Sequence, residues 1–174
     1  MKKLSLLSIP VVLAFVSIAA GWTERPPAAL RLGVFDSRAI AVAFARSEIH
    51  AQWMKELLAR KEAAEKRGNE KEVAAVEAEG ARHQRRFHLQ GFSVAPIDDI
   101  LVHIEKALPS IAEKAGVDAI VNRWNVVHHR PGVELVDVTE AMIAPFHPDE
   151  QTLAIVRDMK DKKPLDFEQA EHAD

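Results

Sequence analysis

The sequence predicts an α+β domain in which a long antiparallel helical hairpin projects from a small β core that is completed by oligomerisation. An alternating apolar run at residues 31–36 suits a strand, and the stretch without Pro or Gly that follows, from residue 38 to about 67, predicts one long helix. Short extended segments come after residue 116. Because a few short strands cannot bury both faces of a sheet, we expect chains to associate.

Residues Met1–Ala20 have the parts of a cleavable signal peptide. Two lysines supply a positive start, an apolar run follows, and small residues near Ala20 offer a cleavage site. The alternative is an uncleaved membrane anchor, but Pro10 and two serines interrupt the run, and a span needs roughly 20 apolar residues. No cysteine follows the run, so a lipoprotein anchor is not expected. The mature protein is therefore expected to be exported, into the periplasm or an equivalent compartment.

Charge and composition limit the possible partners. The 174-residue chain has a net charge of −3, which becomes −5 once the two leader lysines are removed. Such a mildly acidic protein has no general attraction to nucleic acid. Without cysteine, the exported domain must be stabilised by packing or association and not by disulfides. We expect a linker at 21–30, one domain at 31–160 and a charged, disordered tail at 161–174.

The hairpin arm is expected at about residues 38–90. Ser37 can cap its first helix, which carries apolar or small side chains in a heptad-like repeat: Ile40, Phe44, Ser47, Ala51, Met54 and Leu58. Beyond this repeat the helix is charged, so the far end of the arm must stand in solvent or contact a partner. Asn69 can cap the returning helix, whose thinner repeat consists of Val73, Val76, Gly80, His83 and Phe87.

After the arm, a further helix is expected to begin at Pro96. It would bury a set of aliphatic side chains: Ile97, Ile100, Leu101, Ile104, Leu108 and Ile111. Pro109 would kink or split this helix, and Gly116 would end it.

The C-terminal third is expected to begin with two short strands, at 119–122 and 126–129. An extended segment at 133–138 follows, and Thr139 can cap a short helix that runs through residue 146. A last helix is expected from Pro148 to about residue 160.

Four segments, at Leu32–Ser37, Gly116–Val121, Val126–His129 and Val136–Ile143, carry a resemblance to a known family. Their order and local pattern resemble the first strand, the later short strands and the closing helix start of the Skp/OmpH family of periplasmic chaperones. The resemblance covers about Arg31–Phe146.

This resemblance implies a trimer with a shared β core, from which three arms project and cradle unfolded outer-membrane proteins. It implies no ATP, metal, cofactor or catalytic residue. The arms are shorter than is typical of the family, and the mature chain is acidic where the arms of the family are basic. The function expected is an exported holdase for unfolded envelope proteins. The alternative is an envelope adaptor whose hairpin binds one defined partner.

Six residues are the candidate client-binding or partner-binding positions: Trp53, Arg82, Arg85, Arg86, Phe87 and Phe92. The aromatic members either grip clients or belong to the core at the hairpin root. The arginines lie in the basic segment 82–88. This segment either binds an anionic partner, which would be an acidic client or, more weakly, anionic lipid, or it is simply a solvated helix face.

A metal site is not expected, although the chain contains eight histidines. His83 and His88 are five residues apart and do not share a helix face, and adjacent His128 and His129 would point to opposite sides of a strand. An enzyme is not expected either, because the sequence has no glycine-rich phosphate loop, nucleophile elbow or Cys–His arrangement. The paired carboxylates Asp98–Asp99 suit a helix start.

Overall fold

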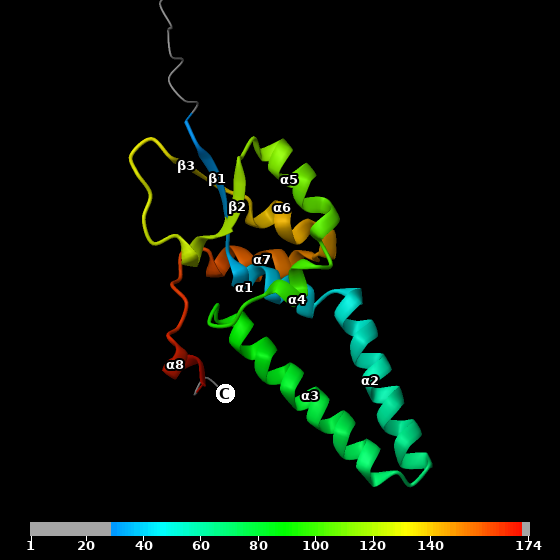
Figure 1. The fold of residues 1–174 in the computed structure, drawn as a ribbon. Helices are drawn as coiled ribbons and strands as arrows, with labels where there is room; N and C mark the ends of the chain where they lie inside the picture. The colour runs from blue at the N-terminus through cyan, green and yellow to red at the C-terminus, as the bar shows by residue number, and fades with distance from the viewer. Residues whose placement is uncertain (1–28, 172–174) are drawn as a thin grey trace, which may run out of the picture.

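A computed structural model describes residues 29–171 of the chain. The expected signal peptide and most of the expected linker lie outside the described residues. The predicted α+β class is confirmed: the chain combines a small parallel sheet with helices that pack beside it (Figure 1). The strands are β1 (Arg31–Phe35), β2 (Ala119–Asn122) and β3 (Glu134–Asp137). The helices are α1 (Ser37–Ala45), α2 (Glu48–Lys66), α3 (Glu70–Gly91), α4 (Asp98–Leu101), α5 (Leu108–Ala115), α6 (Thr139–Ile143), α7 (Glu150–Met159) and α8 (Phe167–Glu171).

The strand order is β2-β1-β3, and both outer strands pair with β1 in parallel. The predicted strand at 119–122 is confirmed, and β3 lies within the extended segment predicted at 133–138. The predicted strand at 126–129 is wrong, because this segment has no regular secondary structure. β2 and β3 run in the same direction on opposite sides of β1. The chain between them therefore cannot be a tight hairpin and must cross over β1.

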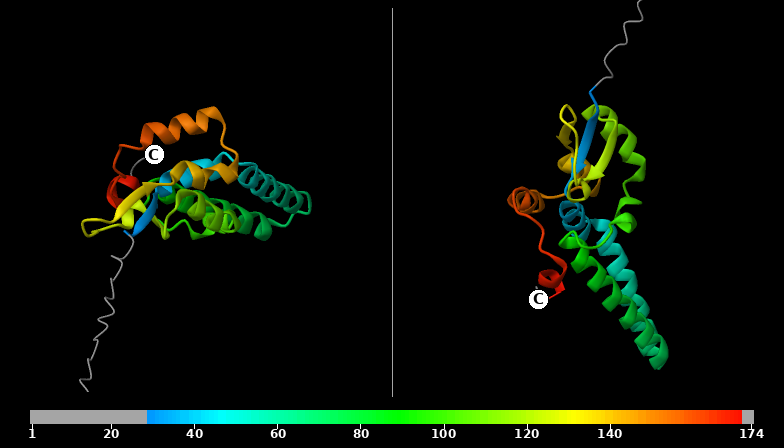
Figure 2. Two further views of the ribbon diagram at one scale, coloured as in Figure 1. Left: turned by 90° about the horizontal axis from the view of Figure 1, so that it is seen from above. Right: turned by 60° about the vertical axis from the view of Figure 1, so that its left-hand side comes forward.

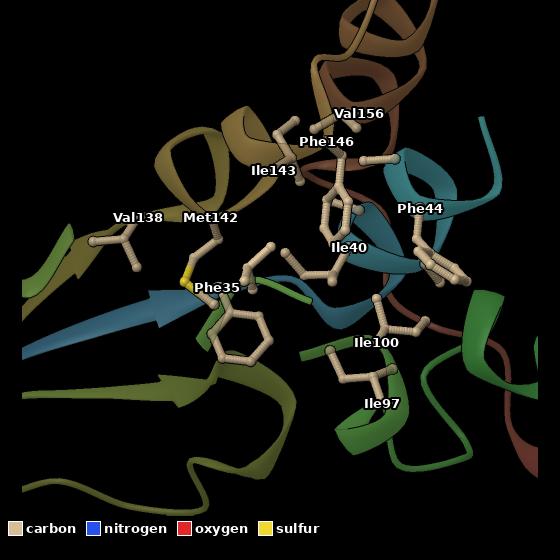
Figure 3. Close-up of a cluster of buried hydrophobic side chains, with 14 of the residues drawn as sticks. Phe35, Ile40, Phe44, Ile97, Ile100, Val138, Met142, Ile143, Phe146 and Val156 are labelled. Carbon is tan, nitrogen blue, oxygen red and sulfur yellow. The ribbon is translucent and has the colours of Figure 1, made fainter. Parts of the chain in front are cut away.

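One face of the sheet carries the core. Phe35 and Ile120 pack there against aliphatic side chains that α4, α6 and the segments beside them supply (Figure 3). Three side chains at the centre of this cluster, Ile40, Ile100 and Ile143, are almost fully buried. The core therefore joins α1, which directly follows β1, to the helices that precede β2 and follow β3.

The predicted continuous helix from residue 38 to 67 is wrong, because the chain breaks at Arg46–Ser47. Ser47 ends α1 by donating its hydroxyl to the Phe44 carbonyl, and it caps α2 by accepting from the His50 amide. Asp36, not Ser37, caps α1. The projecting helices therefore begin at Glu48, and residues 37–45 belong to the body.

The break also changes which side chains of α2 are buried. The heptad-like repeat predicted Met54 and Leu58 as buried, but they are 36% and 59% exposed. Leu57 and Ala64 face α3 instead. The prediction failed because the repeat was continued through the break, where α1 ends and α2 begins with a new cap.

Several local predictions are confirmed. Asn69 caps α3. The helix after Pro96 is split into α4 and α5, with Pro109 in the first turn of α5, and Gly116 ends α5 in the left-handed conformation with φ +62°. One local prediction is wrong: the Thr139 side chain does not cap α6, and the Thr139 amide donates to the Asp137 carboxylate instead.

The C-terminal segment after α7 returns toward the arm. It ends in α8, which packs on α3, and Ala170 is fully buried there (Figure 2). This contact lies within the stretch for which the sequence predicts a tail.

We expect Ile40→Ala to lower the free energy of unfolding by about 2–5 kcal/mol, because it removes a fully buried side chain and leaves a cavity. The control Leu58→Ala, on the exposed side of α2, should change it by about 0.5 kcal/mol or less. Urea unfolding at one protein concentration measures both. Equal losses would contradict this account of the core.

Candidate functional site

Helices α2 and α3 lie side by side and extend away from the sheet (Figures 1 and 2). We call this pair the arm. Leu57, Ala64 and Val76 fill the space between its helices. A Cβ on Gly80 would come within 3.3 Å of the Leu57 side chain, so glycine permits this close approach. The arm is thus held by a narrow apolar strip.

In the outer half of the arm, exposed ion pairs bridge the two helices on either side of the buried Ala64 and Val76. Arg60 pairs with Glu79 at 2.9 Å, and Lys61 pairs with Glu77 at 2.7 Å across the two helices. Arg67 pairs with Glu72 at the turn. Because water and salt screen exposed pairs of this kind, they keep the tip of the arm soluble and add little rigidity.

The inner half of the arm exposes apolar side chains. Ile49, Met54 and Leu58 of α2 are 39%, 36% and 59% exposed. Met54 and Leu58 are one helical turn apart and share one flank, while Ile49 lies on the other. This surface offers separate small apolar contacts on the part of the arm nearest the body.

The root of the arm is a cluster of rings, which we call the root cluster: Phe44, His50, Trp53, His83 and Phe87. Trp53 lies 3.9 Å from the His83 ring, measured between ring centroids. Phe87 packs beside Phe44, which belongs to the core. Two of the predicted binding residues, Trp53 and Phe87, thus lie in the cluster that joins α2 to α3, and both are half-buried.

The other four candidate residues lie apart from this cluster. Arg82, Arg85 and Arg86 are exposed on α3, and Arg86 pairs with Asp99 at 2.9 Å. Phe92 packs edge-on against His88, whose ring also contacts the Ala170 carbonyl at 2.9 Å. The basic segment 82–88 therefore has one side on the body and α8, and another that faces solvent.

The second face of the sheet is covered by the crossing segment between β2 and β3. A hollow of about 640 Å³ lies there, between Val34, Leu135 and residues 126–129. Val127 is 98% exposed and Leu135 is 40% exposed. This face is only partly covered, and its apolar side chains lie beside the polar Arg123, Asp137 and the two histidines of the crossing segment.

The carboxyl ends of the strands carry a polar cluster that the sequence did not indicate. Arg38 donates to both oxygens of Asp36, at 3.0 and 2.6 Å, and Trp124 donates its indole N–H to Asp36 at 3.0 Å. The Arg38 guanidinium lies over the Trp124 ring, 4.9 Å from its centroid. The charged groups of Arg38 and Asp36 are both buried and hydrogen-bonded. The cluster therefore holds Trp124 against the carboxyl end of β1.

Asp137 lies beside this cluster at the end of β3. Partial burial raises the pKa of its carboxyl, but hydrogen bonds from Thr139 and Lys160 and the charge of Arg123 outweigh burial and lower the pKa to about 2. The carboxylate is thus held ionised by three neighbours. Its proximity to Asp36 follows from the parallel pairing of β1 with β3, which the sequence did not reveal.

Within residues 29–171, no group of three or more histidine or acidic side chains is arranged to hold a metal ion. Across this same part of the chain, no helix has the length and apolar character needed to cross a bilayer.

Comparisons with protein-family models, with curated proteins and with solved structures found no match.

We expect Asp137→Asn to lower the free energy of unfolding at pH 7 by about 1–2 kcal/mol, after allowance for the 29% exposure of the side chain. The pKa is lower in the folded protein than the ordinary 3.8, so this stabilisation is present above pH 3.8 and is lost as the pH falls toward 2. Urea midpoints measured from pH 7 down to about 2 should show the difference from wild type narrowing, with most of the change below pH 3.8. A constant difference would contradict the assignment.

Proposed function

We propose that the protein is an exported, periplasmic holdase of the Skp/OmpH type, which binds unfolded outer-membrane or other envelope proteins and acts as a homo-oligomer. The observation that carries this proposal is the arm, whose inner half exposes Ile49, Met54 and Leu58 and whose tip is charged.

A holdase needs contacts that are weak individually and tolerant of sequence. The exposed side chains of α2 fit this need, because each offers a small apolar area and they lie on two flanks of the helix. Methionine also adapts readily to irregular apolar partners. On the neighbouring helix, the solvent-facing Arg82 and Arg85 add positive charge that suits acidic segments of a client or the headgroups of anionic lipids.

Self-association is supported by the sheet. Its second face presents Val127 and Leu135 beside the hollow lined by residues 126–129. Among residues 29–171, the outer edges of β2 and β3 pair with no further strand. Exposed edges and apolar faces favour association, and a second and third copy would cover them.

Two features of the sequence support the family and the compartment. The strand, arm and closing helix follow the order that the Skp/OmpH resemblance implies, and Met1–Ala20 has the pattern of a signal peptide. The family and the compartment are therefore parts of this proposal, as the chaperone activity is.

We expect the protein to suppress aggregation of several unrelated urea-unfolded outer-membrane proteins at near-stoichiometric ratios. Met54→Ser with Leu58→Ser should raise the ratio needed severalfold, because it removes one apolar flank of the arm. Light scattering of the diluted clients measures this. The matched control is Ile155→Ser with Leu165→Ser, two side chains with 37% and 36% exposure outside the arm.

Equal behaviour of the two double variants would contradict client binding on the arm. A protein that ignores every unfolded client but captures one folded envelope protein would instead be the adaptor, and would overturn the holdase.

We expect a stable oligomer at micromolar concentration by multi-angle light scattering. Val127→Asp with Leu135→Asp should dissociate it, because the two charges would be buried between copies. Val102→Asp, at a position 62% exposed on the helical side of the body, is the control and should leave the oligomer intact. A monomeric wild-type protein would overturn the proposed assembly.

A further inference from the structure

The root cluster contains a direct contact between two histidines that the proposed function does not use. Nε2 of His50, on α2, lies 3.2 Å from Nε2 of His83, on α3. The ring planes are within 20° of each other, and the centroids are 5.3 Å apart. Within the part of the chain described, this is a hydrogen bond between the two helices at the base of the arm.

The neighbours of His50 determine where the protons lie. Its Nδ1 is 3.2 Å from the Ala45 carbonyl oxygen, which can only accept a hydrogen bond. Nδ1 therefore carries a proton, so Nε2 of neutral His50 is an acceptor. It follows that His83 donates from its Nε2, and the neutral pair is held by a single proton between the two rings.

Adding one proton does not break this contact. Protonation of His83 at Nδ1 leaves its Nε2–H donating to His50 as before. A second proton must go to Nε2 of His50, and two N–H groups would then face each other across 3.2 Å. Two like charges would also lie within the same stack of rings.

We propose that the His50–His83 pair is a pH-operated latch, which holds α2 against α3 at the arm root while one ring is neutral and releases them when both are protonated.

The surroundings of the pair disfavour the doubly charged state. Partial burial lowers the pKa of His50, and the bond to the Ala45 carbonyl offsets this only in part. Partial burial also lowers the pKa of His83, as do the charges of His50 and Arg86, while Asp99 of the neighbouring α4 raises it. Beyond the Phe44 ring lies one more titratable group, His103, whose ring stacks on Phe44 with centroids 5.2 Å apart.

The sign of the pH effect follows from these directions. Both pKa values are lower in the closed arm than the ordinary 6.5, so the open arm binds more protons once the pH falls below that value. The closed state is therefore favoured above pH 6.5 and is progressively lost below it. Phe44 remains anchored in the core by Phe146, so opening separates the arm helices without unfolding the body. The latch does not depend on what the arm binds.

The test is imidazole ¹⁵N NMR combined with amide exchange on the metal-free protein. At pH 7.5 we expect His50 protonated at Nδ1 and His83 at Nε2, with both pKa values below 6.5. Between pH 7.5 and 5.5, amide opening at the base of α2 and α3 should increase about tenfold or more, after correction for the chemical exchange rate. Opening in α6 should not change.

His83→Phe keeps the stack of rings but removes the shared proton, so the pH-dependent opening should fall severalfold, and only the part that the burial of His50 contributes should remain. His147→Asn is the matched control and should retain the full pH-dependent opening, because His147 is exposed outside the arm and asparagine tolerates its left-handed backbone, with φ 54°. The opposite tautomers in wild type, a pKa at or above 6.5 for either ring, or undiminished pH-dependent opening in His83→Phe would each overturn the latch. The wild-type titration decides the matter even if His83→Phe fails to fold.

Discussion

The ring of Phe44 couples the arm to the body. It contacts Phe146 and His103 on the body side and His50 and Phe87 on the arm side. Because α1 is fixed in the core, this ring sets where the arm starts. Ser47 then lets the chain change direction, by ending one helix and capping the next. The arm is therefore anchored by packing at one end and solvated at the other.

The parallel sheet is what makes this anchoring possible. β1 leads directly into α1, while the chain that returns from the arm reaches β2 only after α4 and α5. Both ends of the arm are thereby tied to the same central strand. The cost of this arrangement is a sheet with short strands, a partly covered second face and two outer edges, and these features favour the self-association that we propose.

Local signals were sufficient to predict much of this fold. Alternation predicted β1, Asn69 predicted the start of α3, and Gly116 predicted the end of α5. Prediction failed where long-range pairing overrides a local preference. The β-branched pair Val126-Val127 favours a strand, but the parallel register requires that segment to cross the sheet.

The functional residues show the same division. The sequence marks Trp53 and Phe87 as candidates because they are aromatic, yet only the packing of α2 on α3 places both in the root cluster. The histidine pair was missed because its members are 33 residues apart, while spacing arguments compare residues on one helix. Asp36 and Trp124 likewise meet only because β1 and β2 are parallel neighbours, and no local pattern encodes that contact.

The central claim is that the arm holds unfolded clients on the exposed apolar flanks near its base. The most direct measurement is site-specific photo-crosslinking, with the crosslinking residue placed at position 58 on the arm or at position 155 on α7. Unfolded outer-membrane proteins are then added. The account predicts efficient crosslinks to several different clients from position 58 and few from position 155. Equal crosslinking from both positions, or none from position 58, would contradict it.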